Sequence, residues 1–141
     1  MAITFHNQHP NLALPKLLNL EKWILKTIEL ESFQLGRLSF IFYTDDALLE
    51  INKQFLNHNT YTDIITFNYN QDQLIIGEIY ISLDRIHENA QSNSVSFYQE
   101  FCRILIHGIL HLLGYHDKSK EEKLEMTSKE DLYLSLLPQI K

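Results

Sequence analysis

Two histidines four residues apart, inside an apolar run, restrict this chain more than any other feature. The segment ILIHGILHLLGYHD, residues 104–117, places His107 and His111 among aliphatic side chains. Residues at i and i+4 lie on the same face of a helix, so the two imidazoles can bind one metal ion without distorting the backbone. Because the run is apolar nearly all round, a helix here must be buried. The pattern therefore predicts a buried central helix, Phe97–Leu113, with a metal site at its end.

Two core histidines hydrogen-bonded to their neighbours are the alternative interpretation. Each ring would then have to satisfy its nitrogens in a nearly apolar setting, whereas a shared metal satisfies both rings. Gly114 is predicted to end the helix with a positive φ, so that the following residues turn back and offer a third ligand. We expect that ligand to be Asp117, with His116 as the alternative, because Ser119 can cap the next helix and leaves Asp117 available.

Three protein ligands leave a fourth position for water, which is the arrangement of a catalytic zinc site. One zinc ion is therefore the expected cofactor. Gly108 stands where a metalloprotease with the H-E-x-x-H motif carries its general base, so ordinary peptide hydrolysis by such a site is disfavoured. A base must then come from elsewhere in the chain. The candidates, each of which is otherwise a surface or ion-paired residue, are Glu78, Asp63, Glu100 and Arg103.

Composition narrows the class of protein. A length of 141 residues with 45% hydrophobic content fits one globular domain, residues 1–141. The net charge of −6 disfavours an extended surface that binds duplex nucleic acid, although it is compatible with a local basic patch. The single cysteine, Cys102, forms no internal disulfide and is expected to be a small buried side chain. No apolar run approaches the ~18 residues of a spanning helix and no secretory leader is present, so we expect a cytoplasmic protein without membrane contact.

Alternation and helical periodicity predict four strands and about five helices. The expected strands are 2–7, 38–44, 63–70 and 74–82. The expected helices are 14–32, a helix starting at the caps Asp45 and Asp46, 84–90, 97–113 and 120–136. The last two strands are separated by a four-residue turn and predict an antiparallel hairpin. Earlier strands are joined through helices and can pair in parallel, so the expected fold is an α+β sandwich with a mixed sheet.

Three local signals refine this prediction. Gly77 within a strand indicates a bulge or a close backbone approach. Ser119 followed by Glu122 makes a capping box for the last helix, which Pro138 is expected to stop. The polar segment 56–61 is predicted to be a loop.

The segment HGILHLLGYHD, residues 107–117, resembles the H-G-x-L-H-L-x-G-Y-D-H motif of the YbeY family, the bacterial metal-dependent endoribonucleases linked to ribosomal RNA maturation. The similarity extends through INKQFLNHNTYTDIITF, residues 51–67, and GEIYIS, residues 77–82. The resemblance implies a metallohydrolase domain with a single zinc held by three residues of the long motif. It also implies hydrolysis of RNA phosphodiester bonds and a role in ribosome assembly and quality control.

Residue by residue, His107 and His111 match the first two ligands of the family motif. Asp117 stands at the position of the third His, and His116 at the position of the usual Asp, so the final pair is reversed. A carboxylate ligand is the simplest interpretation of this reversal. Where many members carry an Arg that would bind phosphate or stabilise charge in the transition state, this chain has Leu56.

Together with the predicted metal site, the resemblance implies a zinc-dependent endoribonuclease that cleaves single-stranded RNA during ribosomal RNA processing and small-subunit maturation. The expected partner is ribosomal RNA in the context of the ribosome, together with a ribosome-associated protein. Arg85, Arg103 and Lys53 are the candidate phosphate contacts. Two alternatives remain open: a metal-stabilised ribosome-assembly factor without chemistry, which the absent Arg and the Gly at position 108 fit, and a zinc hydrolase of a peptide or small molecule.

Overall fold

Four strands and five helices make up the part of the chain that the computed structural model describes, residues 2–17, 19–56 and 62–137. The strands are β1 (Ile3–Asn7), β2 (Gln34–Tyr43), β3 (Ile64–Asn68) and β4 (Leu74–Ser82). The helices are α1 (Leu20–Leu30), α2 (Asp45–Leu56), α3 (Leu83–Ser92), α4 (Phe97–Leu112) and α5 (Lys120–Leu134). The predicted α+β class, with four strands and five helices, is confirmed. Residues 57–61 and Pro138, for which a loop and a helix stop were predicted, lie outside the described residues.

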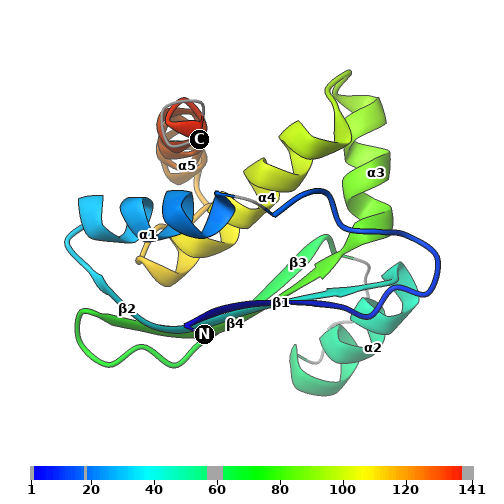
Figure 1. The fold of residues 1–141 in the computed structure, drawn as a ribbon, viewed down its shortest axis with the longest axis horizontal. Helices are drawn as coiled ribbons and strands as arrows, with labels where there is room; N and C mark the ends of the chain where they lie inside the picture. Colours follow the sequence, from blue (N-terminus) through cyan, green and yellow to red (C-terminus); the bar gives the residue numbers. More distant parts are fainter. Residues whose placement is uncertain (1, 18, 57–61, 138–141) are drawn as a thin grey trace.

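The four strands form one mixed sheet in the order β1-β2-β4-β3. β1 pairs with β2 and β2 with β4 in parallel, whereas β3 and β4 form the predicted antiparallel hairpin. Parallel neighbours need a crossover, and α1 provides it between β1 and β2. Figure 1 shows α1, α3, α4 and α5 above the sheet and α2 below it. One face of the sheet therefore carries most of the helical layer.

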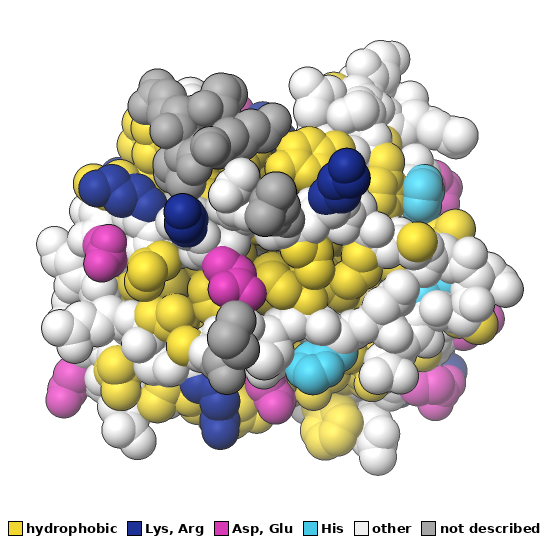
Figure 2. All heavy atoms as spheres, viewed as in Figure 1, with side chains coloured by type: hydrophobic (Ala, Val, Ile, Leu, Met, Phe, Trp, Pro, Cys, Tyr) yellow, Lys and Arg dark blue, Asp and Glu magenta, His cyan; other side chains and the backbone are white. Residues whose placement is uncertain are grey.

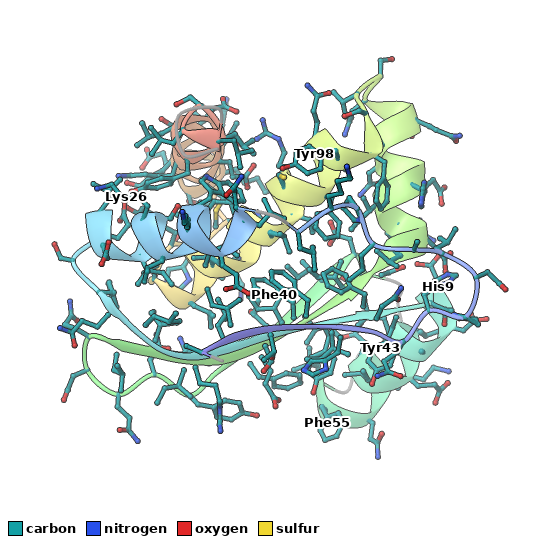
Figure 3. All side chains as sticks on the ribbon, in the orientation of Figure 1. His9, Lys26, Phe40, Tyr43, Phe55 and Tyr98 are labelled. Carbon is teal, nitrogen blue, oxygen red and sulfur yellow. The ribbon has the colours of Figure 1, made fainter. Side chains whose placement is uncertain are left out.

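The hydrophobic core lies between the sheet and α4. Phe40, Phe42 and Ile79 point into it from the strands and are fully buried, and Phe40 lies between sheet and helices in Figure 3. Two glycines let α4 approach closely. A Cβ on Gly77 would lie 2.7 Å from a methyl of Leu112, and a Cβ on Gly108 would lie 2.9 Å from a methyl of Ile64. The signal at Gly77 thus marks a close approach to α4, and the register shift of the sheet lies between Leu35 and Arg37 instead.

Two element boundaries differ from the predictions. α1 begins at Leu20 and not at residue 14, because Leu14 and Leu17 pack against the core from a non-helical segment whose apolar spacing imitates a helical period. Asn19, with a left-handed φ of 69°, separates the two. β2 begins at Gln34 and not at residue 38, so Gly36 lies inside the strand. A Cβ added at Gly36 would lie 2.8 Å from the carbonyl oxygen of Ile75.

The start of α2 also differs in detail. Thr44, and not an aspartate, caps the helix, because its Oγ1 accepts a hydrogen bond from Ala47 N at 3.1 Å. Asp45 lies in the first turn and accepts instead from Ser82 Oγ at 2.6 Å and from Arg85 Nε at 3.1 Å. The two acidic residues still place negative charge at the helix N-terminus, where it is favourable.

The end of α4 has the predicted glycine stop. Gly114 has φ 106°, and its N–H donates to His111 O at 3.1 Å while Tyr115 N donates to Leu110 O at 3.0 Å. These are the two hydrogen bonds of a Schellman motif, which satisfies carbonyls that the helix leaves unpaired. The chain then turns back toward α4. α5 starts at Ser119, whose predicted capping box with Glu122 is confirmed.

A half-buried carboxylate connects this turn to the rest of the helical layer. Glu31 follows α1, and its side chain, 12% exposed, accepts hydrogen bonds from the hydroxyls of Tyr115, at 2.7 Å, and Tyr133. Lys129 of α5 adds an ion pair at 3.3 Å. Three segments that are far apart in sequence thus meet at one carboxylate, which fixes the turn after α4 relative to α1 and α5.

Two further features agree with the sequence. Cys102 is fully buried, as expected of a small apolar side chain. Within the described ranges, none of the helices has both the length and the apolar composition that crossing a membrane requires.

The single tryptophan gives a test of how α1 is anchored. Trp23 is fully buried and its indole N–H donates to Tyr133 O at 2.7 Å. Trp23→Phe leaves that carbonyl without its donor and the space of the larger ring unfilled, so we expect a loss of about 2–3 kcal/mol in the free energy of unfolding, measured by urea denaturation with circular dichroism. Lys26→Ala on the exposed side of α1 is the control and should stay within about 0.5 kcal/mol of wild type. Equal losses in both variants would contradict the anchoring role.

The Glu31 cluster makes stability depend on pH in a stated direction. Burial alone raises the pKa of Glu31, but the hydroxyls of Tyr133 and Tyr115 and the charge of Lys129 outweigh it and hold the pKa below its ordinary value of 4.5. A depressed folded-state pKa stabilises the fold above that value, and this stability is lost as pH falls through the folded-state pKa. Glu31→Gln should therefore cost about 1–2 kcal/mol at neutral pH, with the difference from wild type shrinking in acid.

Urea unfolding at a series of pH values measures both parts of this prediction. Glu29→Gln removes an exposed carboxylate two residues earlier and is the matched control, for which we expect no measurable loss. The contradicting outcomes are equal free energies of unfolding for wild type and Glu31→Gln at neutral pH, or a difference that grows in acid. Either result would show that Glu31 does not hold the three segments together.

Candidate metal centre

Three potential ligands converge where α4 ends and the chain turns back. His107 and His111 of α4 approach each other through their Nε2 atoms, which lie 3.1 Å apart. Oδ2 of Asp117 lies 3.3 Å from Nε2 of His107 and 3.4 Å from Nε2 of His111. All three side chains are half-buried. Among the described residues, this is the group of histidine, cysteine and acidic side chains whose geometry suits a metal ion.

The spacing of the three atoms suits a tetrahedral ion. Ligand atoms bound to zinc at about 2.0–2.1 Å in a tetrahedron lie about 3.3–3.4 Å from one another. The three distances here, 3.1, 3.3 and 3.4 Å, are close to that edge length. Two imidazole nitrogens and one carboxylate oxygen also form a donor set that zinc accepts. The arrangement therefore fits one ion with three protein ligands and a fourth position left for solvent or substrate.

Each imidazole is oriented by a partner on its other nitrogen. Nδ1 of His107 donates to Oε2 of Glu130 on α5 at 2.6 Å, and Nδ1 of His111 donates to the carbonyl of Tyr115 at 3.1 Å. With Nδ1 protonated, Nε2 is the nitrogen that can bind a metal. A carboxylate or carbonyl behind a ligating histidine is the usual support of a metal site, because it fixes the ring and raises its basicity.

Glu130 carries a second interaction that keeps it in place. Its other oxygen accepts from Nη1 of Arg103 at 2.8 Å, and Nη2 of Arg103 donates to Asp131 at 2.7 Å. Glu130 is 6% exposed, so its charge needs such partners. Arg103 lies one turn before His107 on the same face of α4, and the guanidinium thus stabilises the carboxylate that orients the first ligand.

The two rings differ in their electrostatic surroundings. Burial lowers the pKa of His107, but the hydrogen bond and charge of Glu130, followed by the charges of Asp117 and Asp63, outweigh it and raise this pKa overall. Burial, together with the positive charge of His107, lowers the pKa of His111. One ring thus holds a proton more strongly and the other more weakly than a free imidazole, and a metal ion would compete with the proton chiefly at His107.

Asp63, one of the sequence candidates for a base, lies beside this cluster. It precedes β3 and lines a cavity of about 110 Å³ together with His107, Glu130 and Arg103. Burial raises the pKa of Asp63, opposed in part by the charge of His107. Its backbone carbonyl accepts from Ser82 N at 3.0 Å, which fixes this segment against the end of β4. Glu100 lines the same cavity from α4.

The structure does not bring the other sequence candidates to the cluster. Glu78 follows Gly77 on β4, so its side chain lies on the sheet face opposite α4, where it accepts from the hydroxyl of Tyr80 at 3.3 Å. His116 is exposed and is not part of the group of three. Arg85 pairs with Asp45, as described above, and Lys53 with Glu50 at 3.6 Å.

Sequence reasoning missed Glu130 and the role of the Tyr115 carbonyl. No clear pattern in the sequence marked Glu130, because α5 has little amphipathic character and only the structure shows that its buried residues are Met126, Glu130 and Tyr133. A charged residue at a core position needs a partner, and His107 and Arg103 supply it. The carbonyl of Tyr115 had no sequence signal either, because its position depends on the Schellman turn.

Comparisons with known proteins agree over nearly the whole chain. The family described as Endoribonuclease YbeY matches residues 3–138. The Endoribonuclease YbeY of Flavobacterium psychrophilum is 47% identical over 114 residues, 81% of this chain and 81% of that protein. That of Parabacteroides distasonis is 38% identical over 139 residues, 99% of this chain and 98% of that protein.

A solved structure shows the same fold. The solution structure of a Thermotoga maritima protein superposes with a TM-score of 0.69 at 28% identity, covering 96% of this chain and 88% of that one. The histidine motif, the α+β fold and the match over residues 3–138 lead to one conclusion, which confirms the resemblance found in the sequence. The chain belongs to the YbeY family.

Proposed function

We propose that this protein is a zinc-dependent endoribonuclease that cleaves single-stranded segments of ribosomal RNA during rRNA processing and small-subunit maturation in the cytoplasm. In this proposal residues 1–141 act as one metallohydrolase domain. The observation that carries it is the group of His107, His111 and Asp117, whose three ligand atoms have near-tetrahedral spacing and leave one side open. The relatives' name, Endoribonuclease YbeY, supplies the reaction class.

Zinc in this group would supply Lewis acidity toward a phosphoryl oxygen and toward the attacking water. The chain itself supplies the orientation. Glu130 and the carbonyl of Tyr115 hold the two imidazoles with Nε2 turned toward the ion. Glu31 holds Tyr115 through its hydroxyl, so the geometry of the third ligand depends on a contact with α1.

Asp63 is the best-placed group to accept the proton of the attacking water. It lies in the cavity beside His107, and burial raises its pKa, which makes it a stronger base than an exposed carboxylate. Arg103 lines the same cavity and supplies a cation beside the site. Glu78 on the opposite sheet face has no such access, and Asp63 and Arg103 are therefore the proposed catalytic pair.

Single-stranded RNA suits this site better than a duplex. The chain has a net charge of −6, and Arg103 next to the site already interacts with two carboxylates. Backbone charge alone would give weak affinity for a duplex, whereas unpaired bases can be bound by stacking and hydrogen bonds. We propose that the ribosomal context, including a ribosome-associated protein, supplies the remaining affinity.

One observation favours a second function, that of a ribosome-assembly factor without chemistry. Leu56, at the position where many family members carry an Arg, ends α2 and is 42% exposed. An apolar side chain there offers no charge to a transition state. In this alternative the metal serves only to hold α4, the turn and α5 together.

Metal content and RNA cleavage test the site together. Asp117→Ala, and separately His107→Ala combined with His111→Ala, should lose stoichiometric zinc by elemental analysis, because two or fewer ligands remain. Cleavage of a ribosomal RNA fragment should fall in proportion. His116→Ala is the matched control, since its ring lies outside the group, and it should keep both properties. Full zinc in the double variant would show that the site is assigned wrongly, and bound zinc without cleavage in wild type would favour the assembly factor.

The role of Asp63 predicts a different pattern. Asp63→Asn should keep zinc, because Asp63 is not among the three ligands, yet lower kcat by roughly 10²–10⁴-fold through loss of the base. The acidic limb of the pH–rate profile should also disappear. Asp72→Asn in the β3–β4 turn, an exposed aspartate, is the control and should match wild type. An unchanged pH profile in Asp63→Asn would assign the base elsewhere.

A further inference from the structure

A second, larger cavity lies along the first half of α4. It has a volume of about 630 Å³ and opens between the end of α5 and the turn that joins α3 to α4. Figure 2 shows the surface hollowed at the upper edge of the molecule, and Figure 3 shows Tyr98 on that side of α4. Pockets that bind small organic ligands have volumes of about 300–1,000 Å³. Its lining residues are Asn93, Val95, Tyr98, Gln99, Glu100, Arg103, Leu134 and Leu137.

This cavity adjoins the smaller cavity beside the candidate metal centre. Glu100 and Arg103 line both it and the smaller cavity that reaches His107 and Asp63. On α4, residues 99, 103 and 107 are spaced four apart and share one face. At a rise of about 1.5 Å per residue, the eight residues from Gln99 to His107 extend about 12 Å along the helix axis. The two cavities thus lie next to each other along this face of α4 and share Glu100 and Arg103 as lining residues.

The walls of the cavity suit a flat, uncharged group with a polar edge. Val95, Leu134 and Leu137 supply apolar surface, and Tyr98 supplies an aromatic ring. Burial, with a hydrogen bond to Cys102, raises the pKa of Tyr98 to about 12, so the phenol is neutral at physiological pH.

The polar groups are two amides, a carboxylate and the guanidinium of Arg103. Asn93 and Gln99 lie at the rim, and the amide oxygen of Gln99 already accepts from Ser96 N at 3.0 Å, which leaves its amide nitrogen as the group to offer. Glu100, 8% exposed, presents acceptors for N–H donors. The guanidinium of Arg103 is already paired with two carboxylates outside the cavity, so the charges here favour the base of a nucleotide over a phosphate.

We propose that this cavity is a nucleobase subsite, which binds one unstacked base of single-stranded RNA while the bond to be cleaved lies at the metal centre. The inference rests on the proposed function and adds to it the position of a recognised base. A stacked strand rises about 3.4 Å per nucleotide and an extended strand more, so the distance of about 12 Å places that base within about three nucleotides of the scissile bond.

The test combines base removal in the RNA with filling of the cavity in the zinc-loaded protein. Single-stranded oligoribonucleotides carry an abasic unit at one position at a time on either side of the cleavage site. In wild type, one abasic position within three nucleotides should lower kcat/KM by roughly tenfold or more, because a base–aromatic contact is lost. Val95→Trp fills the cavity and should lower kcat/KM for the intact oligonucleotide by a similar factor. In this variant, placing the abasic unit at the same position should cause no further loss of kcat/KM.

A control variant separates filling of the cavity from the mere presence of an added tryptophan. Leu124→Trp adds a tryptophan at an exposed site on α5 outside the cavity, and it should behave as wild type. Leu134→Trp, at the end of α5 on the other side of the cavity, is a second filling variant, used because Val95 lies in a turn, and it should reproduce Val95→Trp. Abasic effects of equal size at every position, or a filled variant that stays sensitive to the same abasic unit, would overturn the subsite.

A direct binding measurement separates failure of the subsite from failure of the proposed function. The four nucleoside monophosphates are titrated into the full chain and followed by amide chemical shifts. Shifts at Val95–Glu100 that vanish in Val95→Trp would support the subsite even if wild type cleaved no RNA, a result that would refute only the nuclease proposal. Cleavage by wild type with no such shifts and no abasic position effect would refute only the subsite.

Discussion

The close approach of α4 to the sheet is the constraint on which the rest of the structure depends. Gly108 and Gly77 leave no room for a side chain between helix and strands, because an added Cβ would lie within 3 Å of Ile64 or Leu112. Neighbouring residues on a helix point about 100° apart, so a helix with Gly108 against the sheet turns His107 away from it, toward α5. The position that carries the base in H-E-x-x-H proteins is therefore a packing position here, and a base must come from another element.

Polar contacts attach α5 to the rest of the fold. Its sequence has little amphipathic pattern, and its buried side chains include Glu130. Contacts with His107 and Arg103 at one point, and with Glu31 at another, hold the helix. Polar contacts depend strongly on geometry and charge, so the position of α5 is coupled to the protonation of His107. The carboxylate that orients His107 is thus also part of what docks the helix.

The sequence predicted those features that depend on local spacing. The histidine pair, the glycine stop after α4, the capping box of α5 and the β3–β4 hairpin each involve residues close along the chain, and each has the predicted form. The start of α1 was wrong, because Leu14 and Leu17 reach the core from a non-helical segment, where burial and not helical period sets their spacing. Glu130 was missed since its partners on α4 lie 23 and 27 residues away, and only the tertiary fold brings them together.

The order of His116 and Asp117, the last two residues of the family motif, is related to the turn that follows α4. Tyr115 is fixed at both ends, by its carbonyl against His111 and by its hydroxyl against Glu31. Two residues later, the carboxylate of Asp117 lies beside the Nε2 atoms of both histidines of α4, whereas His116 is exposed. The turn thus brings residue 117, and not residue 116, to the histidine pair. The reversed pair therefore places a carboxylate where the family motif has an imidazole.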